Sequence, residues 1–125
     1  MKYLLFCLLL TATSPAFSQS PANFSGLWYT SSGNYISIHQ SGNTIIAATL
    51  GIQANTRGVW EAFQATVVGQ SATAITVWGY VDSTVTVRLT SPTTMLITQL
   101  SCSSLVPGWL CAYPYGTQFT ATRIF

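Results

Sequence analysis

The chain has 125 residues, of which 49% are hydrophobic and 13% aromatic, whereas only 5% are charged, and its formal net charge is +2. So few cations, with no cluster of Lys or Arg, exclude a nucleic-acid-binding surface, because such surfaces neutralise many phosphates. The wealth of aromatic and β-branched residues excludes intrinsic disorder. The sequence therefore indicates a small folded protein whose polar surface is made mainly of Ser, Thr, Asn and Gln.

The N-terminus has the pattern of an export signal. Lys2 supplies a positive start, residues 3–10 are an unbroken apolar run, and Ala-Phe-Ser at 16–18 places small residues where a signal peptidase cleaves. The apolar run is far shorter than the ~20 residues that a transmembrane helix needs. We therefore expect a signal peptide over 1–18, a single exported domain over 19–125, and a secreted or periplasmic location.

Cysteine usage agrees with export. Cys7 lies in the apolar run and would leave with the signal, so the mature domain keeps only Cys102 and Cys111. An even number of cysteines in an exported chain predicts one disulfide. A zinc site would lack two of its four ligands, so we expect no metal and no cofactor.

The remainder of the chain reads as strands. Short runs rich in Val, Ile, Thr and aromatic residues alternate with clusters of Gly, Asn, Ser and Pro, and no segment has apolar residues at helical spacing. Eight strands are predicted, at 26–30, 35–40, 44–50, 59–68, 74–81, 84–90, 94–101 and 117–124.

A meander of eight strands would expose unpaired backbone groups at both edges, and closing the sheet removes both. The predicted fold is therefore all-β, an eight-stranded antiparallel up-and-down β-barrel. The interior of such a barrel either fills with its own side chains or holds one small ligand. Both alternatives stay open from the sequence.

The hairpins predict which side chains face inward. A two-residue turn at Asp82-Ser83 would pair Tyr80 with Val85, and Trp78 with Val87. The alternating valines mark the buried face, so this register sends Trp78 and Tyr80 inside. A turn at Gly42-Asn43 sends His39 outside and gathers four inward residues, Ile36, Ile38, Ile45 and Ala47.

Gly26-Leu27-Trp28 resembles the opening strand of the calycins, the lipocalin and avidin barrels. In that family a Gly-x-Trp packs its indole against a basic residue of the closing strand, and Arg123 in Thr-Ala-Thr-Arg-Ile matches this residue in kind and position. The resemblance implies a structural contact between Trp28 and Arg123. A guanidinium plane stacked on an indole would help to close the barrel.

Residues 26–34 look more like avidin and streptavidin than like a lipocalin, and 75–78 and 119–120 echo later strands of that family. The pattern that contacts biotin in that family is broken, since Thr30 stands where an Asn would and Asn34 where a Ser would. The resemblance therefore implies an avidin-like barrel, and the broken pattern argues against biotin binding.

Residues 24–28 and 40–44 also resemble a bacterial secreted barrel domain with a Gly-Leu-Trp opening and a Gln-x-Gly-Asp/Asn-Thr turn. This resemblance implies an exported bacterial barrel and carries no activity with it.

Catalysis is poorly supported. The mature chain offers one histidine, His39, and two carboxylates, Glu61 and Asp82, with no nucleophile-elbow motif. We expect no enzyme and assign no catalytic residue. Strand parity puts Glu61 on the face of Phe63, where it would be either a buried ligand anchor or a solvated group at a bend. We favour the solvated interpretation, because carboxylates are rarely buried unpaired.

Aromatic residues are the best candidates for binding. The segment 107–116 is rich in Pro and Gly, and a bridge from Cys102 to Cys111 would stiffen it, so its aromatic residues could form a recognition surface. The candidate ligand-binding residues are Trp60, Trp78, Tyr80, Trp109, Tyr113 and Tyr115.

Three functions follow from these features. The first is an exported non-catalytic binding module that takes a small apolar or carbohydrate-like ligand at the open end of the barrel. The second is a protein-interaction barrel, such as a protease inhibitor or an accessory subunit. The third is a small outer-membrane barrel, which ranks last because several strands are shorter than the ~9–11 residues of a membrane-spanning strand. The oligomeric state stays open.

Overall fold

The computed structural model describes residues 20–51, 58–107, 111 and 113–125. The predicted signal peptide and Trp109 lie outside these residues. The described chain forms eight strands in the following order: β1 (Gly26–Thr30), β2 (Tyr35–Ser41), β3 (Thr44–Leu50), β4 (Trp60–Val68), β5 (Ser71–Trp78), β6 (Val81–Ser91), β7 (Thr94–Ser104) and β8 (Gln118–Arg123).

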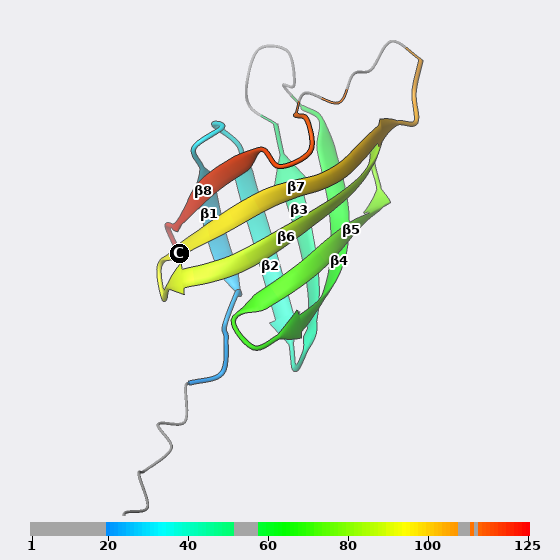
Figure 1. Ribbon diagram of the computed structural model, residues 1–125. Helices are drawn as coiled ribbons and strands as arrows, with labels where there is room; N and C mark the ends of the chain where they lie inside the picture. Colours follow the sequence, from blue (N-terminus) through cyan, green and yellow to red (C-terminus); the bar gives the residue numbers. More distant parts are fainter. Residues whose placement is uncertain (1–19, 52–57, 108–110, 112) are drawn as a thin grey trace, which may run out of the picture.

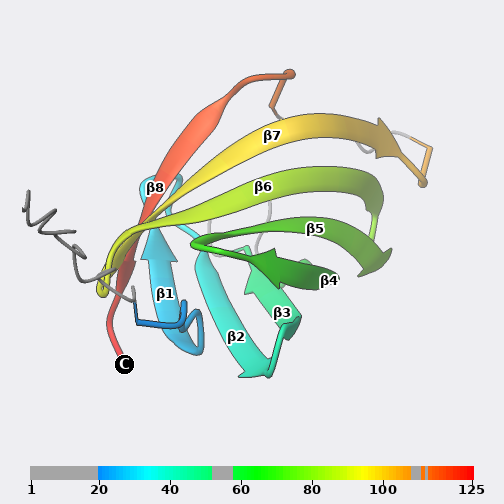
Figure 2. The ribbon, with the colours of Figure 1, turned by 60° about the horizontal axis from the view of Figure 1, so that its bottom comes forward.

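The strands close into one barrel in chain order (Figures 1 and 2). Every strand is antiparallel to both neighbours, and β1 pairs with β8 through Trp28 opposite Arg123. The predicted all-β antiparallel barrel is therefore confirmed. Closure is favoured because it leaves no strand edge with unpaired backbone groups.

The hairpin between β2 and β3 is also as predicted. Ser41 pairs with Thr44 across the turn at Gly42-Asn43. This register buries Ile36, Ile38 and Ile45 and leaves His39 exposed.

The hairpin between β5 and β6 corrects the prediction. Its turn lies at Gly79-Tyr80, whereas Asp82 and Ser83 are inside β6. Gly79 has φ = 151°, which an L side chain rarely adopts, so this position of the turn favours glycine. The register between β4 and β5 also shifts at Ala62/Phe63, so that Trp78 lies opposite Ala62 on the outside of the barrel, where it is 50% exposed. The prediction that Trp78 and Tyr80 line the interior is wrong.

The closed end of the barrel holds the most deeply buried side chains, Trp28, Phe24 and Met95. The Nε1–H of Trp28 donates a hydrogen bond of 2.9 Å to the carbonyl oxygen of Phe24. The Arg123 guanidinium carbon lies 4.6 Å from the centroid of the Trp28 ring, which confirms the contact that the calycin resemblance implied.

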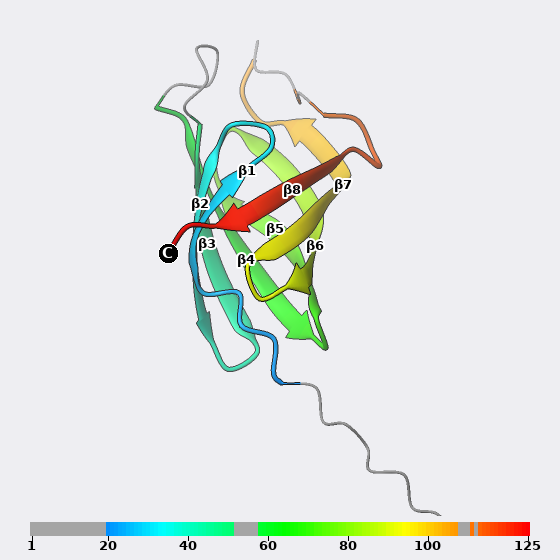
Figure 3. The same cartoon turned by 90° about the vertical axis from the view of Figure 1, so that its left-hand side faces the viewer.

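The segment before β1 is held across this end (Figure 3). Gln40 donates from Nε2 to the carbonyl oxygen of Ala22 and accepts at Oε1 from the N–H of Phe24. Arg123 donates to the carbonyl oxygen of Asn23. These bonds fix Phe24 in the core, so the segment that precedes β1 serves as a plug.

None of the described residues forms a helix that is both long and apolar enough to span a membrane.

Candidate functional site: a cavity at the open end of the barrel

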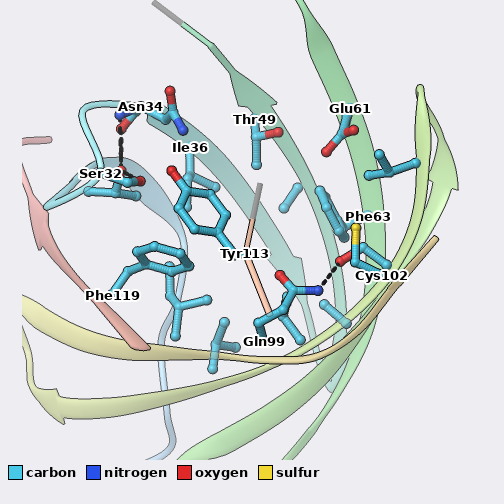
Figure 4. A pocket seen from close by; sticks show the side chains of 18 of the residues that line it. Ser32, Asn34, Ile36, Thr49, Glu61, Phe63, Gln99, Cys102, Tyr113 and Phe119 are labelled. Carbon is cyan, nitrogen blue, oxygen red and sulfur yellow. Dashed lines mark hydrogen bonds between the residues drawn. The ribbon is translucent and has the colours of Figure 1, made fainter. Parts of the chain in front are cut away.

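A cavity of about 630 Å³ lies inside the barrel above the Trp28 core (Figure 4). The interior is therefore not filled by the side chains of the barrel, which was one of the two alternatives that the sequence left unresolved. All eight strands contribute to its walls, and the walls are mostly apolar. The apolar lining residues are Ile36, Ile38, Ile45, Ala47, Val59, Phe63, Ala65, Ala74, Val81, Val85, Val87, Met95, Ile97 and Phe119.

Small side chains account for the empty space. Ala65 on β4 is paired with Ile45 on β3 and with Ala74 on β5, and Ala74 is paired in turn with Val85 on β6. Two alanines therefore stand side by side in a row of inward-facing positions. Because neither alanine side chain reaches the barrel axis, the apolar side chains of the opposite wall do not pack against them, and space is left between the two walls.

Polar residues gather at the mouth, where the strand ends lie. This rim takes residues from both halves of the sheet and consists of Thr30, Ser32, Asn34, Thr49, Glu61, Ser83 and Gln99. The cavity is therefore apolar in depth and polar at its entrance, the usual arrangement of a small-molecule site.

Glu61, near the start of β4, is half-buried and turned toward the cavity, so the solvated interpretation is wrong. Burial raises the pKa of its carboxyl, and hydrogen bonds from the backbone N–H groups of Val81 and Tyr80 act in the opposite direction. Gly79 makes room for this side chain, since a Cβ there would lie 2.7 Å from Cγ of Glu61. The carboxylate is thus clamped between β4 and the β5–β6 turn.

Gln99 on β7 is only 6% exposed. Its Nε2 donates to Oγ of Ser83 at 2.7 Å and also to the carbonyl oxygen of Ser101. Both amide hydrogens are thereby used within the wall. The amide oxygen turns toward the middle of the cavity (Figure 4).

The opposite side of the rim is built by the turn between β1 and β2. Oγ1 of Thr30 lies 2.8 Å from Oγ of Ser32 and accepts a hydrogen bond of 3.0 Å from the N–H of Asn34. Oδ1 of Asn34 is buried, and among the described residues it has no hydrogen-bond partner.

The predicted disulfide between Cys102 and Cys111 is confirmed, and both cysteines line the cavity. Tyr113, two residues beyond Cys111, projects into the cavity and packs edge-on against Phe119, with ring centroids 4.5 Å apart. Of the predicted ligand-binding residues that the structure describes, Tyr113 is the one that lies at the cavity. Tyr115 is 80% exposed and does not line it.

The predicted ligand residues Trp60 and Trp78 lie on the outer surface of the barrel. Their rings stack on each other with centroids 3.9 Å apart and an interplanar angle of 22°. Leu50 is the strand partner of Trp60 and is also exposed. Together with Tyr80 in the turn, these aromatics contribute nothing to the cavity wall.

Several lining residues were missed by the sequence analysis. Gln99 follows Met95 and Ile97 at every second position of β7, so strand alternation could have placed its side chain inside. Phe119 could have been found in the same way from the closing strand. Asn34 gave no signal, because its position depends on how the turn after β1 folds back.

The chain was compared with family models, curated proteins and solved structures. No family model, curated protein or solved structure matches it. The function must therefore be argued from the cavity itself.

Proposed function

We propose that this protein is an exported, non-catalytic carrier or receptor that binds one small apolar molecule inside its barrel. The observation that carries the proposal is the open interior of about 630 Å³ with apolar walls. Pockets of ~300–1,000 Å³ are typical of sites for small molecules. An apolar guest gains roughly 25 cal/mol for each Å² of its surface removed from water, and these walls offer such burial on all sides.

Export is part of the proposal. The disulfide is compatible with an oxidising compartment, and 1–18 has the composition of a cleaved signal. The pairing of Trp28 with Arg123 supports the resemblance to small secreted barrels of the calycin type. The intact mass of the purified protein, which should correspond to a chain starting at Gln19, tests the cleavage.

The cavity supports this function over an outer-membrane barrel. Membrane barrels turn a polar side inward and an apolar band outward. Here the inward residues of β2 and β3 include Ile36, Ile38 and Ile45, so the interior is apolar where a membrane barrel would be polar. The outward side is mixed, with Ser37 and His39 as well as Ile46 and Leu50.

Protein interaction is the second candidate. The stacked pair of Trp60 and Trp78, with Leu50 beside it, is an exposed apolar group on the outer face of β3, β4 and β5. Exposed aromatics of this kind are enriched at protein interfaces. Binding inside the barrel and docking on this face do not exclude each other.

A binding assay with a neutral fluorescent probe tests the leading proposal. N-phenyl-1-naphthylamine brightens when it enters an apolar site, so its fluorescence should rise on addition of the protein and fall again when dodecanol displaces it. Native mass spectrometry of the untreated protein should in addition show a bound small molecule that is lost after extraction with organic solvent.

Neighbouring alanines on β3 give a matched pair of variants. Ala47 faces the cavity, whereas Ala48 is exposed on the outer surface. Ala47→Phe should fill the cavity and abolish probe binding, and Ala48→Phe should leave binding unchanged. Equal binding by both variants and the unmodified protein would overturn the proposal.

A further inference from the structure

The polar residues at the rim of the cavity indicate which head group the ligand carries. We propose that the preferred guest is a basic amphiphile, whose apolar body fills the barrel and whose protonated primary amine pairs with Glu61 at the mouth. This inference rests on the proposed function and adds to it the chemical class of the ligand.

The first argument is charge. Among the described residues that line the cavity, Glu61 alone carries a formal charge, and none is Arg, Lys or His. The described arginines lie elsewhere, since Arg123 is stacked on Trp28 at the closed end and Arg88 is exposed on the outer surface. Arg57 lies outside the described residues. A half-buried carboxylate facing an apolar cavity favours a guest that brings the positive charge.

The second argument is hydrogen bonding. The hydrogens on Nε2 of Gln99 are used within the wall, so its Oε1 is what this side chain offers to a guest. Oδ1 of Asn34 is likewise an acceptor that lacks a donor among the described residues. Glu61 is an acceptor whenever it is ionised. These three acceptors at the rim suit a ligand that donates hydrogen bonds.

The third argument is that the Glu61 carboxylate is held in place and can still accept further hydrogen bonds. Its carboxylate accepts hydrogen bonds from the backbone N–H groups of Val81 and Tyr80, and these bonds fix its position at the β5–β6 turn. A carboxylate offers about four lone-pair sites, so two remain after these bonds. Its side chain projects into the cavity, where a guest can reach those sites (Figure 4).

A primary ammonium fits these three features. It carries three donors, no acceptor and one positive charge, and a charged pair with hydrogen bonds is stronger than a neutral contact. A carboxylate head would face Glu61 as a like charge and would bring only acceptors. An alcohol would gain the apolar burial without the charge.

Ligands that share one apolar body isolate the head group. Dodecylamine, dodecanol and dodecanoate are compared at neutral pH, below the concentrations at which they aggregate, by displacement of N-phenyl-1-naphthylamine. We expect dodecylamine to bind about tenfold more tightly than dodecanol, since an extra charged hydrogen bond is worth at least ~1.4 kcal/mol. Dodecanoate should bind most weakly.

Two substitutions that each remove one negative charge locate the effect. Glu61→Gln keeps the shape of the side chain and should bring the affinity for dodecylamine down to that for dodecanol. Asp82→Asn removes a charge three positions from Gly79 on an exposed part of β6, and it should preserve the preference for the amine.

Equal affinities of the amine and the alcohol for the unmodified protein would overturn the inference while leaving apolar binding intact. The inference also fails if Asp82→Asn abolishes the preference as fully as Glu61→Gln. If none of the three ligands displaces the probe, the proposed function fails together with the inference. Should Glu61→Gln not fold, the order of the three ligands on the unmodified protein still tests the head group.

Discussion

The guanidinium of Arg123, on the last strand, stacks 4.6 Å from the ring centroid of Trp28, on the first, and their Cα positions are partners in the pairing that closes the barrel. The indole in turn donates to the carbonyl oxygen of Phe24. This contact joins the first and last strands at the closed end, and neither residue lines the cavity, so stability and binding can be perturbed separately.

Arg123→Ala should lower the free energy of unfolding by about 1–2 kcal/mol, because it removes a cation–π contact and a hydrogen bond to Asn23. Thermal unfolding measures this, and probe binding well below the melting temperature should be unchanged. Arg88→Ala, at an exposed position of β6, is the control and should have little effect. A melting temperature unmoved by Arg123→Ala would contradict the role of this contact in closure.

Phe24→Ala should cost about 3–5 kcal/mol, because Phe24 is completely buried although it precedes the first strand. Denaturant unfolding gives the free-energy change. Phe24→Leu keeps most of the apolar volume and should cost clearly less. If both variants are as stable as the unmodified protein, the segment before β1 is not the plug described above.

Removing the disulfide should destabilise the protein by about 2–3 kcal/mol, since it closes a short loop with a sequence separation of 9. The variant carries Cys102→Ala and Cys111→Ala together, and chemical denaturation measures the loss. Intact mass with and without reductant shows whether the bond is present in the isolated protein. Two free thiols in protein taken from its own compartment would contradict it.

The pKa of Glu61 is raised by burial above its ordinary value of 4.5. In this case the folded state holds the proton more tightly than the unfolded state. Stability should therefore be greatest at low pH, and should fall as the pH rises from about 4.5 through the raised pKa. Melting temperatures measured across this range should show a decline that is absent in Glu61→Gln. Parallel curves for the two proteins would show that Glu61 is not perturbed.

The stacked pair of Trp60 and Trp78 should stabilise the outer surface without affecting binding. A double-mutant cycle with Trp60→Ala and Trp78→Ala should give a coupling of about 0.5–1.5 kcal/mol, typical of aromatic pairs. Probe affinity should be the same in all four proteins, because both rings lie outside the barrel. A marked loss of probe affinity in Trp78→Ala would contradict this prediction and show that Trp78 contributes to binding.

The sequence alone determined the class and closure of the fold. Its strand periodicity, the Gly42-Asn43 turn and the even cysteine count are local signals, and each translates directly into a strand face, a hairpin register or a bridge. The inward isoleucines of β2 and β3 followed from these signals without any knowledge of distant contacts.

Only the tertiary structure decided what the interior contains. A shift of register between β4 and β5 at Ala62/Phe63 sets Trp78 opposite Ala62 on the outer face, where strand alternation alone would have placed it inside. The volume of the cavity depends on alanines from two strands standing side by side, and the orientation of Glu61 depends on a turn from another hairpin. Such properties arise from strands that meet across the barrel, so no single segment of the chain encodes them.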